Sequence, residues 1–158
     1  MRAVTEIMVA GAAEIDTILA LWGELAAYHA RLDPAFTPSA QWRSTYAGYL
    51  STLVRRSDAR VLAARSDGRL VGFGVGRITL LPPFFAERRR GFIQDVFTHP
   101  DYRRQGIARR VVEALLTWLR EEQVETVELT VATNNDEAIR LWERLGFRSY
   151  MLHFKRAL

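Results

Sequence analysis

The stretch from Phe92 to Glu122 constrains the fold of this chain most strongly, because its hydrophobic periodicity changes part-way along. Its first part, Phe92–Thr98, is rich in β-branched and aromatic residues and predicts a strand, which Pro100 and Asp101 end. From Ile107 onwards the apolar residues recur at helical spacing and predict a helix with one buried face. A strand is therefore expected to lead through a basic, glycine-containing turn directly into a helix N-terminus.

The turn between these two elements has the chemistry of a phosphate-binding site. The first turn of a helix leaves backbone N–H groups without partners, and the helix dipole adds partial positive charge there. Small side chains allow a phosphate group to approach the backbone closely. The turn contributes the small residues Gly106 and Ala108, and its arginines are Arg103, Arg104, Arg109 and Arg110. A solvated basic turn without a ligand is the alternative that these residues alone leave open.

Two short motifs match the signature of a known superfamily. Residues 103–108, Arg-Arg-Gln-Gly-Ile-Ala, resemble the pattern Arg/Gln-x-x-Gly-x-Gly/Ala, and His-Pro-Asp-Tyr at 99–102 resembles its usual lead-in. Residues 135–147, Asn-Asp-Glu-Ala-Ile-Arg-Leu-Trp-Glu-Arg-Leu-Gly-Phe, resemble the pattern Asn-x-x-Ala-x-x-x-Tyr-x-x-x-Gly-Phe. Together these motifs resemble the acetyl-CoA-dependent N-acetyltransferases of the GNAT superfamily. The resemblance covers roughly residues 92–148.

Periodicity and turn chemistry predict the element order β-α-α-β-β-β-α-β-α-β for one domain, residues 1–158. This order agrees with the GNAT fold, an α/β (α+β) mixed sheet of about six to seven strands with about four helices. The strands are expected at Val4–Ala10, Ala59–Ala64, Leu70–Leu80, Phe92–Thr98, Val124–Val131 and Phe147–Lys155. The helices are expected from Gly11 to about Ala30, at Ser39–Arg56, from Ile107 and after Asn134 or Asn135, and Leu81–Gly91 is expected to be a loop.

Two features of the expected elements leave alternatives open. Residues 72, 74 and 76 are glycines, so one face of that strand is bare, and either a packed helix or a substrate approaches it closely. The helix at 39–56 carries an aromatic face, which at this spacing lies more often in a core than in a ligand site. The residues of that face include Trp42, Tyr46 and Tyr49.

The resemblance implies how acetyl-CoA binds as a co-substrate. The fourth strand of the superfamily pairs with the pantetheine arm, and one of its amides near Val96 holds the thioester oxygen as charge develops. The pyrophosphate lies on the backbone amides of the turn. The residues expected to contact the coenzyme are therefore Val96, Phe97, Thr98, Arg103, Arg104, Gln105, Gly106, Ile107, Ala108, Arg109, Asn135 and Trp142.

Direct transfer to an amine requires a group that removes the proton of the amine. Superfamily members often carry a carboxylate at the positions of Gln94 or Asp95, so Asp95 is the candidate base and Val96 the second catalytic position. A structural carboxylate is the alternative for Asp95, and His99 is the second candidate base. Strand alternation places Ile93, Asp95 and Phe97 on one face and Gln94, Val96 and Thr98 on the other.

Trp142 stands where the superfamily usually has a tyrosine that protonates the leaving thiolate, and an indole N–H hardly gives up a proton.

The resemblance implies that the end of the first helix and the next helix form one wall of the acceptor site. The residues proposed to line the site are Tyr28, His29 and Asp33, with Phe84 from the following loop. An ordinary helix C-terminus, with His29 against the helix dipole, is the alternative for the first group. The pair Phe84-Phe85 could instead meet a partner subunit, because a soluble loop rarely displays both rings to water.

The cysteine content and the net charge exclude some kinds of site and disfavour some ligands. The absence of cysteine excludes disulfides, a thiolate nucleophile and a cysteine-built metal site, and the histidine spacing suggests no metal. The net charge of +4 suits an anionic ligand or nucleic acid, but the basic residues are scattered, so nucleic acid is the weaker alternative. No run is long enough to span a membrane, and a cytoplasmic protein is expected.

The predicted function is acetylation of a primary amine of a small molecule or peptide. A coenzyme A-binding module without turnover remains open, as does a homodimer.

Overall fold

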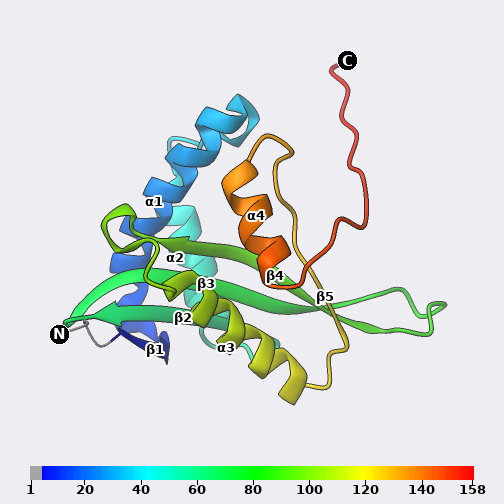
Figure 1. Ribbon diagram of the computed structural model, residues 1–158, viewed down its shortest axis with the longest axis horizontal. Helices are drawn as coiled ribbons and strands as arrows, with labels where there is room; N and C mark the ends of the chain where they lie inside the picture. The colour runs from blue at the N-terminus through cyan, green and yellow to red at the C-terminus, as the bar shows by residue number, and fades with distance from the viewer. Residues whose placement is uncertain (1–4) are drawn as a thin grey trace.

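The computed structural model describes residues 5–158 and shows one five-stranded sheet in the order β1-β2-β3-β4-β5 (Figure 1). The strands are β1 (Thr5–Val9), β2 (Ala59–Ser66), β3 (Arg69–Leu80), β4 (Arg89–Thr98) and β5 (Thr126–Glu128). The α-helices are α1 (Ile15–Leu32), α2 (Trp42–Leu53), α3 (Ile107–Glu121) and α4 (Asp136–Arg144). The order of elements up to α4 is the predicted one, and the mixed α+β architecture is confirmed.

Helices cover both faces of the sheet, and each face has its own apolar cluster (Figure 1). On one face, α1 and α2 pack against Phe73 and Phe97. On the other face, Val111 and Leu115 of α3 form the cluster that Trp142 of α4 also joins. The fold therefore has three layers, with α1 and α2 on one face of the sheet and α3 and α4 on the other.

The glycines of β3 make room for α3. A Cβ on Gly74 would lie 2.4 Å from Cγ1 of Val111, and one on Gly76 would lie 3.1 Å from Cδ2 of Leu115. The first distance is shorter than real Cβ contacts and the second is tighter than most of them, so glycine, above all Gly74, lets the helix lie this close to the sheet. The neighbour that the sequence left undecided is thus a packed helix.

The parallel pairing of β4 with β5 is short. It runs only from Arg90 opposite Thr126 to Phe92 opposite Glu128. Beyond Phe92, β4 pairs with β3 on one side, and no other described strand lies on its second side. The half of β4 that leads to the basic turn therefore presents an open backbone edge.

Three expectations about strands were wrong. Residues Arg89–Gly91 belong to β4 and not to a loop, because they pair with Ile78–Leu80. The fifth strand has three residues instead of Val124–Val131. Residues Phe147–Lys155 form no strand, since no partner strand pairs with them among the described residues, so the described sheet has five strands and not six to seven. The expected first strand residue Val4 lies outside the described residues.

Candidate active site

A bulge in the middle of β4 shapes the site. Val75 of β3 lies opposite Asp95, but the next residue, Gly76, lies opposite Ile93, so Gln94 has no partner on β3. A bulge of this kind interrupts strand alternation and redirects side chains. The expected placement of Gln94 and Asp95 on opposite faces was therefore wrong, because both side chains meet α2.

Hydrogen bonds from α2 hold these two side chains. The hydroxyl of Tyr46 donates to Oδ2 of Asp95 at 2.8 Å, and that of Tyr49 donates to Oε1 of Gln94 at 2.6 Å. The amide Nε2 of Gln94 then donates to the same Oδ2 of Asp95 at 3.0 Å. Four side chains thus form one connected polar group at the centre of an otherwise apolar helix-to-sheet contact.

Burial perturbs the titration of this group. It raises the pKa of Asp95 above the usual aspartate range, although hydrogen bonds from Tyr46 and Gln94 offset part of the rise. Burial and then the charge of Asp95 also raise the pKa of the Tyr46 hydroxyl, so this phenol stays protonated and donates. A buried carboxylate whose pKa is raised is a candidate general base.

The turn after β4 has the geometry of an anion cradle. Arg104 and Gly106 have positive φ angles of 59° and 79°, and a Cβ on Gly106 would meet nothing within 4 Å. The first hydrogen bond into α3 runs from N of Arg110 to O of Gly106 at 3.1 Å, so the amides of Ile107 to Arg109 have no partner within the helix. An anion can therefore approach these amides from open space.

The open edge of β4 ends at this cradle. Thr98, its last residue, is buried, and its Oγ1 finds no hydrogen-bond partner in the described part of the chain. The backbone oxygen of Thr98 accepts a 3.3 Å hydrogen bond from Nε of Arg103. Nη1 of that arginine lies 3.8 Å from Oε2 of Glu137 at the start of α4. The strand edge, the cradle and α4 thus adjoin one another, as a phosphate-bearing, extended ligand requires.

Comparison with known proteins decides the family, since a model of the acetyltransferase (GNAT) family matches residues 23–147. This chain belongs to the GNAT family. N-alpha-acetyltransferase RimI of Mycobacterium tuberculosis is 36% identical over 88 residues, which are 55% of this chain and 51% of that protein. The chain thus spans about half the length of the curated relatives that it matches.

Solved structures share the fold at low identity. The BH1408 protein of Bacillus halodurans superposes with a TM-score of 0.86 at 21% identity, covering 97% of this chain and 99% of the other. The aminoglycoside N-acetyltransferase AAC(6')-Iy, solved with CoA, gives 0.79 at 15% identity, covering 99% and 97%. The GNAT architecture is therefore reproduced over nearly the whole chain.

The second GNAT motif forms the start of α4. Asn135 is 6% exposed, and its Oδ1 accepts from N of Ala138 at 3.3 Å and from the hydroxyl of Tyr28 at 3.0 Å. It therefore caps α4 and ties this helix to α1. Trp142 is half-buried, and its ring meets Phe147 edge-on at 5.3 Å between centroids. Coenzyme contacts by Asn135 and Trp142 remain predictions.

The end of α1 brings one of the expected acceptor residues, His29, close to Asp95. Burial lowers the pKa of His29, and the nearby charge of Asp95 offsets part of this shift. Tyr28 adjoins His29, with their rings 6.0 Å apart, and its hydroxyl donates to Asn135 at the start of α4. Asp33 lies one turn further, accepts from N of Ala35 at 2.9 Å and pairs with Lys155.

Two candidates lie apart from this group. Phe84 lies in the turn between β3 and β4 and is 79% exposed, and this turn projects at one end of the sheet (Figure 1). The structure does not bring it to the other acceptor residues. The Nδ1 atom of His99 accepts from N of Asp101 at 3.3 Å, which makes His99 a cap of the turn after β4.

Sequence reasoning missed the two tyrosines that bind Asp95 and Gln94. Tyr46 and Tyr49 were interpreted as part of a core stripe, because their spacing matches the buried face of α2. Their hydroxyls could have indicated this role, because the hydroxyl of a buried tyrosine usually has a hydrogen-bond partner. A stripe with two such hydroxyls opposite a strand with Gln-Asp indicates a polar group inside the contact.

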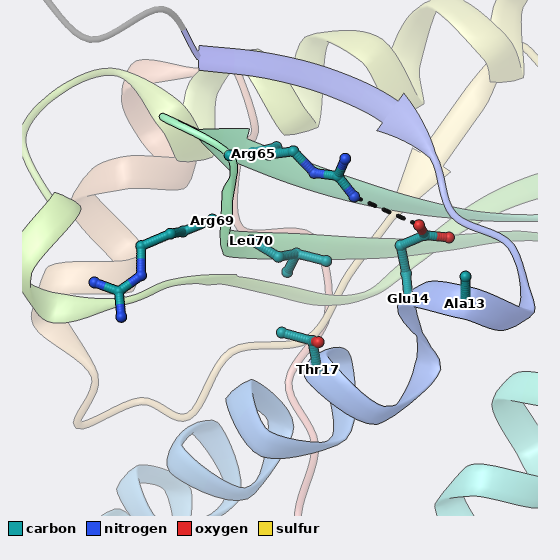
Figure 2. Close-up of a pocket in the computed structure, with 7 residues that line it drawn as sticks. Ala13, Glu14, Thr17, Arg65, Arg69 and Leu70 are labelled. Carbon is teal, nitrogen blue, oxygen red and sulfur yellow. Dashed lines mark ion pairs between the residues drawn. The ribbon is translucent and has the colours of Figure 1, made fainter.

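A separate cavity of about 440 Å³ lies between the start of α1 and the β2–β3 hairpin (Figure 2). Arg65 points into it toward Glu14, with Nη2 and Oε1 3.5 Å apart, while Arg69 points away. None of the residues that line this cavity is among the candidate coenzyme, catalytic or acceptor residues. Within residues 5–158, no three or more histidine, aspartate or glutamate side chains are grouped to hold a metal, and no helix has the length and apolarity to cross a bilayer.

Proposed function

We propose that this chain transfers an acetyl group from acetyl-CoA to a primary amine of a small molecule or peptide. One observation carries the proposal: β4 combines an open edge that ends at an anion cradle with a bulge that presents a carboxylate of raised pKa. The edge and cradle serve the coenzyme, and the carboxylate serves the amine. Both reactants are then held on one strand, which supplies the proximity that a direct transfer needs.

The cradle residues fit the coenzyme. The free amides of Ile107, Ala108 and Arg109 hold the pyrophosphate, and the exposed side chains of Arg104 and Arg109 add positive charge. Backbone groups of Val96 to Thr98 hold the pantetheine arm along the open edge. Acetyl-CoA supplies the thioester, and the absence of cysteine agrees with a transfer that needs no covalent enzyme intermediate.

Asp95 is proposed as the general base. It takes a proton from the amine as the amine nitrogen bonds to the acetyl carbon, and the carbon–sulfur bond breaks to release the thiolate of coenzyme A. A β4 amide near Val96 donates to the carbonyl oxygen on which negative charge develops. Trp142 shapes the channel, and solvent returns a proton to the thiolate.

The acceptor is proposed to enter between α1 and α2, past Tyr28 and His29. Two related proteins carry names that indicate different amines, an N-alpha-acetyltransferase and an aminoglycoside N-acetyltransferase. The proposal for this chain is therefore a primary amine, with polyamines, amino acids, aminoglycosides and peptide N-termini as the classes to compare.

Thiol release from acetyl-CoA, measured across a panel of these amines, tests the proposal. Amine-dependent release that saturates with at least one class is the expected result. Calorimetric titration of acetyl-CoA in parallel separates the alternatives. Tight binding without amine-dependent release from any class would indicate a coenzyme-binding module, and the absence of binding would contradict the proposal altogether.

A further inference from the structure

The only lysine of the sequence, Lys155, lies against the proposed acceptor wall. Its Nζ atom pairs with Oδ2 of Asp33, the residue that caps the end of α1. Asp33 is one of the residues expected to bind the acceptor amine. A primary amine of the chain itself is therefore held beside the place where an amine substrate is proposed to enter.

Asp33 presents an oriented carboxylate to this amine. Its N donates to O of His29 at 3.0 Å, and its Oδ1 accepts from N of Ala35 at 2.9 Å. Oδ2 is therefore the oxygen left for a cation. The side chain of Lys155 is 72% exposed and that of Asp33 31%, and an ion pair so exposed to water is weak. The pair thus positions the Lys155 amine without holding it permanently.

The pair lies about one helical turn from the residue next to the proposed base. Asp33 follows His29 by four residues, a rise of roughly 6 Å along a helix. His29 in turn is close enough to Asp95 for their charges to interact. Lysine carries its amine on a flexible four-carbon stem, so a rotation of this stem moves Nζ over a comparable distance. The Lys155 amine can therefore approach Asp95 along the end of α1.

The segment that carries Lys155 can follow such a movement. Residues 148–158, called the tail below, are exposed and form no helix or strand. They leave the body of the protein after α4 and run as an extended trace (Figure 1). The tail starts at Phe147, whose N donates to O of Trp142 at 3.0 Å. From there to Lys155 an extended chain spans up to roughly 25 Å, which leaves the lysine room to shift by a helical turn.

We propose that Lys155 is itself an acceptor of the acetyl group, so that the protein acetylates its own tail. This inference rests on the proposed transfer from acetyl-CoA. The Lys155 ammonium releases one proton to solvent as it leaves Asp33, and Asp95 takes a second proton as Nζ bonds to the acetyl carbon. The carbon–sulfur bond breaks, and the thiolate of coenzyme A receives a proton from solvent. An acetylated lysine has no charge, so the modification detaches the tail from Asp33.

Mass spectrometry of the full chain after incubation with acetyl-CoA alone tests the proposal. The wild type is expected to gain an acetyl group that peptide mapping places on Lys155. Lys155→Arg keeps the charge beside Asp33 but lacks the amine, so its tail should gain none. The matched control combines Lys155→Arg with Arg156→Lys, which moves the lysine by one residue. Neighbouring side chains of an extended chain point in opposite directions, so this lysine should be acetylated at least tenfold more slowly.

Asp95→Asn separates self-acetylation from a chemical side reaction of acetyl-CoA. It should slow the modification of Lys155 at least tenfold, and an amine that supports thiol release should also slow it in the wild type, because both amines need one site. Equal rates in wild type and Asp95→Asn, or in wild type and the lysine-shift variant, would overturn the proposal. The tail variants lie outside the packed core, so their comparison decides the question even for an Asp95→Asn protein that does not fold.

Thiol release with the amine panel, measured on the same wild-type sample, separates this inference from the proposed function. Amine-dependent release without acetylation of Lys155 would overturn self-acetylation alone. Loss of both would contradict the transfer itself. The rate constant at Lys155 should not depend on protein concentration, and one that rises in proportion to concentration would overturn a step within the molecule.

Discussion

Asp95 is the proposed general base of the site. It lies in an apolar helix-to-sheet contact, yet Tyr46 and Gln94 both donate to its Oδ2 atom. Burial favours the protonated form and the two donors favour the ionised form, and burial is the larger influence. The pKa of Asp95 is therefore raised, the direction that strengthens a carboxylate as a proton acceptor.

Removal of the Tyr46 hydroxyl should raise the pKa of Asp95 further. In Tyr46→Phe, the ionised carboxylate loses a donor that stabilises it, while the ring keeps its stacking on Trp22, 4.3 Å away. The acidic limb of kcat/KM, which rises as Asp95 ionises, should move to higher pH. Tyr49→Phe is the control, because that hydroxyl binds Gln94 instead and should shift the limb less. Equal shifts in both variants would argue against a direct effect on Asp95.

The ionised carboxylate of Asp95 should lower the free energy of unfolding at neutral pH. The pKa of Asp95 is higher in the folded than in the unfolded chain, so its contribution to stability is full below the unfolded pKa and is lost as pH rises through the folded pKa. Asp95→Asn should therefore raise the urea midpoint at pH 7, with a difference from wild type that vanishes at low pH.

Asp58→Asn provides a control of opposite sign for this stability effect. The hydrogen bond from Arg56 lowers the pKa of Asp58, so its stabilisation is present at neutral pH and disappears as pH falls through the folded pKa. Asp58→Asn should therefore lower stability slightly at pH 7. An Asp95→Asn variant that is less stable than wild type at pH 7 would mean that the hydrogen bonds outweigh burial.

At the scale of elements, the junction of β4 with α3 is the proposed coenzyme cradle. Gly106→Val should weaken acetyl-CoA binding at least tenfold, about 1.4 kcal/mol, because its side chain would project into the space where the pyrophosphate approaches. Gly68→Val is a close control, since Gly68 has the same φ of 79° and also meets nothing within 4 Å. Calorimetry should show a loss of affinity only for Gly106→Val. An equal loss in both variants would assign the effect to backbone strain.

Helix α4 tests whether packing or proton donation matters at Trp142. Its ring packs on the α3 side of the sheet and against Phe147. Trp142→Phe should keep most of the activity, whereas Trp142→Ala should destabilise the fold by up to roughly 3–5 kcal/mol, the range for loss of a large aromatic side chain. Thiol release and thermal unfolding measure the two effects. Loss of thiol release in a folded Phe variant that still binds acetyl-CoA would show that the indole N–H is required.

The local elements of this fold were readable from the sequence, because each carries its own periodicity and turn residues. The hairpin turn at Asp67-Gly68, the cap Asn135 and the helix after Gly106 are examples. The bulge at Gln94 was not readable, since it depends on the register between β3 and β4 and leaves no mark in the pattern of β4 itself. The link between Tyr46 and Asp95 joins residues 49 positions apart, so only the fold reveals it.

At the scale of the whole molecule, the two halves of the proposed site lie on different parts of the sheet. Asp95 bonds to α2 on the side that α1 and α2 cover, while the cradle and α4 adjoin the open edge of β4. Residues Phe147–Lys155 were expected to form the last strand, but a strand needs a partner and the described residues contain none for it.

The measurement that tests the central claim most directly is the pH profile of kcat/KM for wild type and Asp95→Asn, with acetyl-CoA affinity determined for both. If β4 binds the coenzyme along its edge and uses Asp95 as the base, Asp95→Asn should lower kcat/KM by about 10²- to 10⁴-fold and abolish the ascending acidic limb, while acetyl-CoA affinity stays unchanged. Wild-type rates at every pH in a folded Asp95→Asn protein would contradict the account.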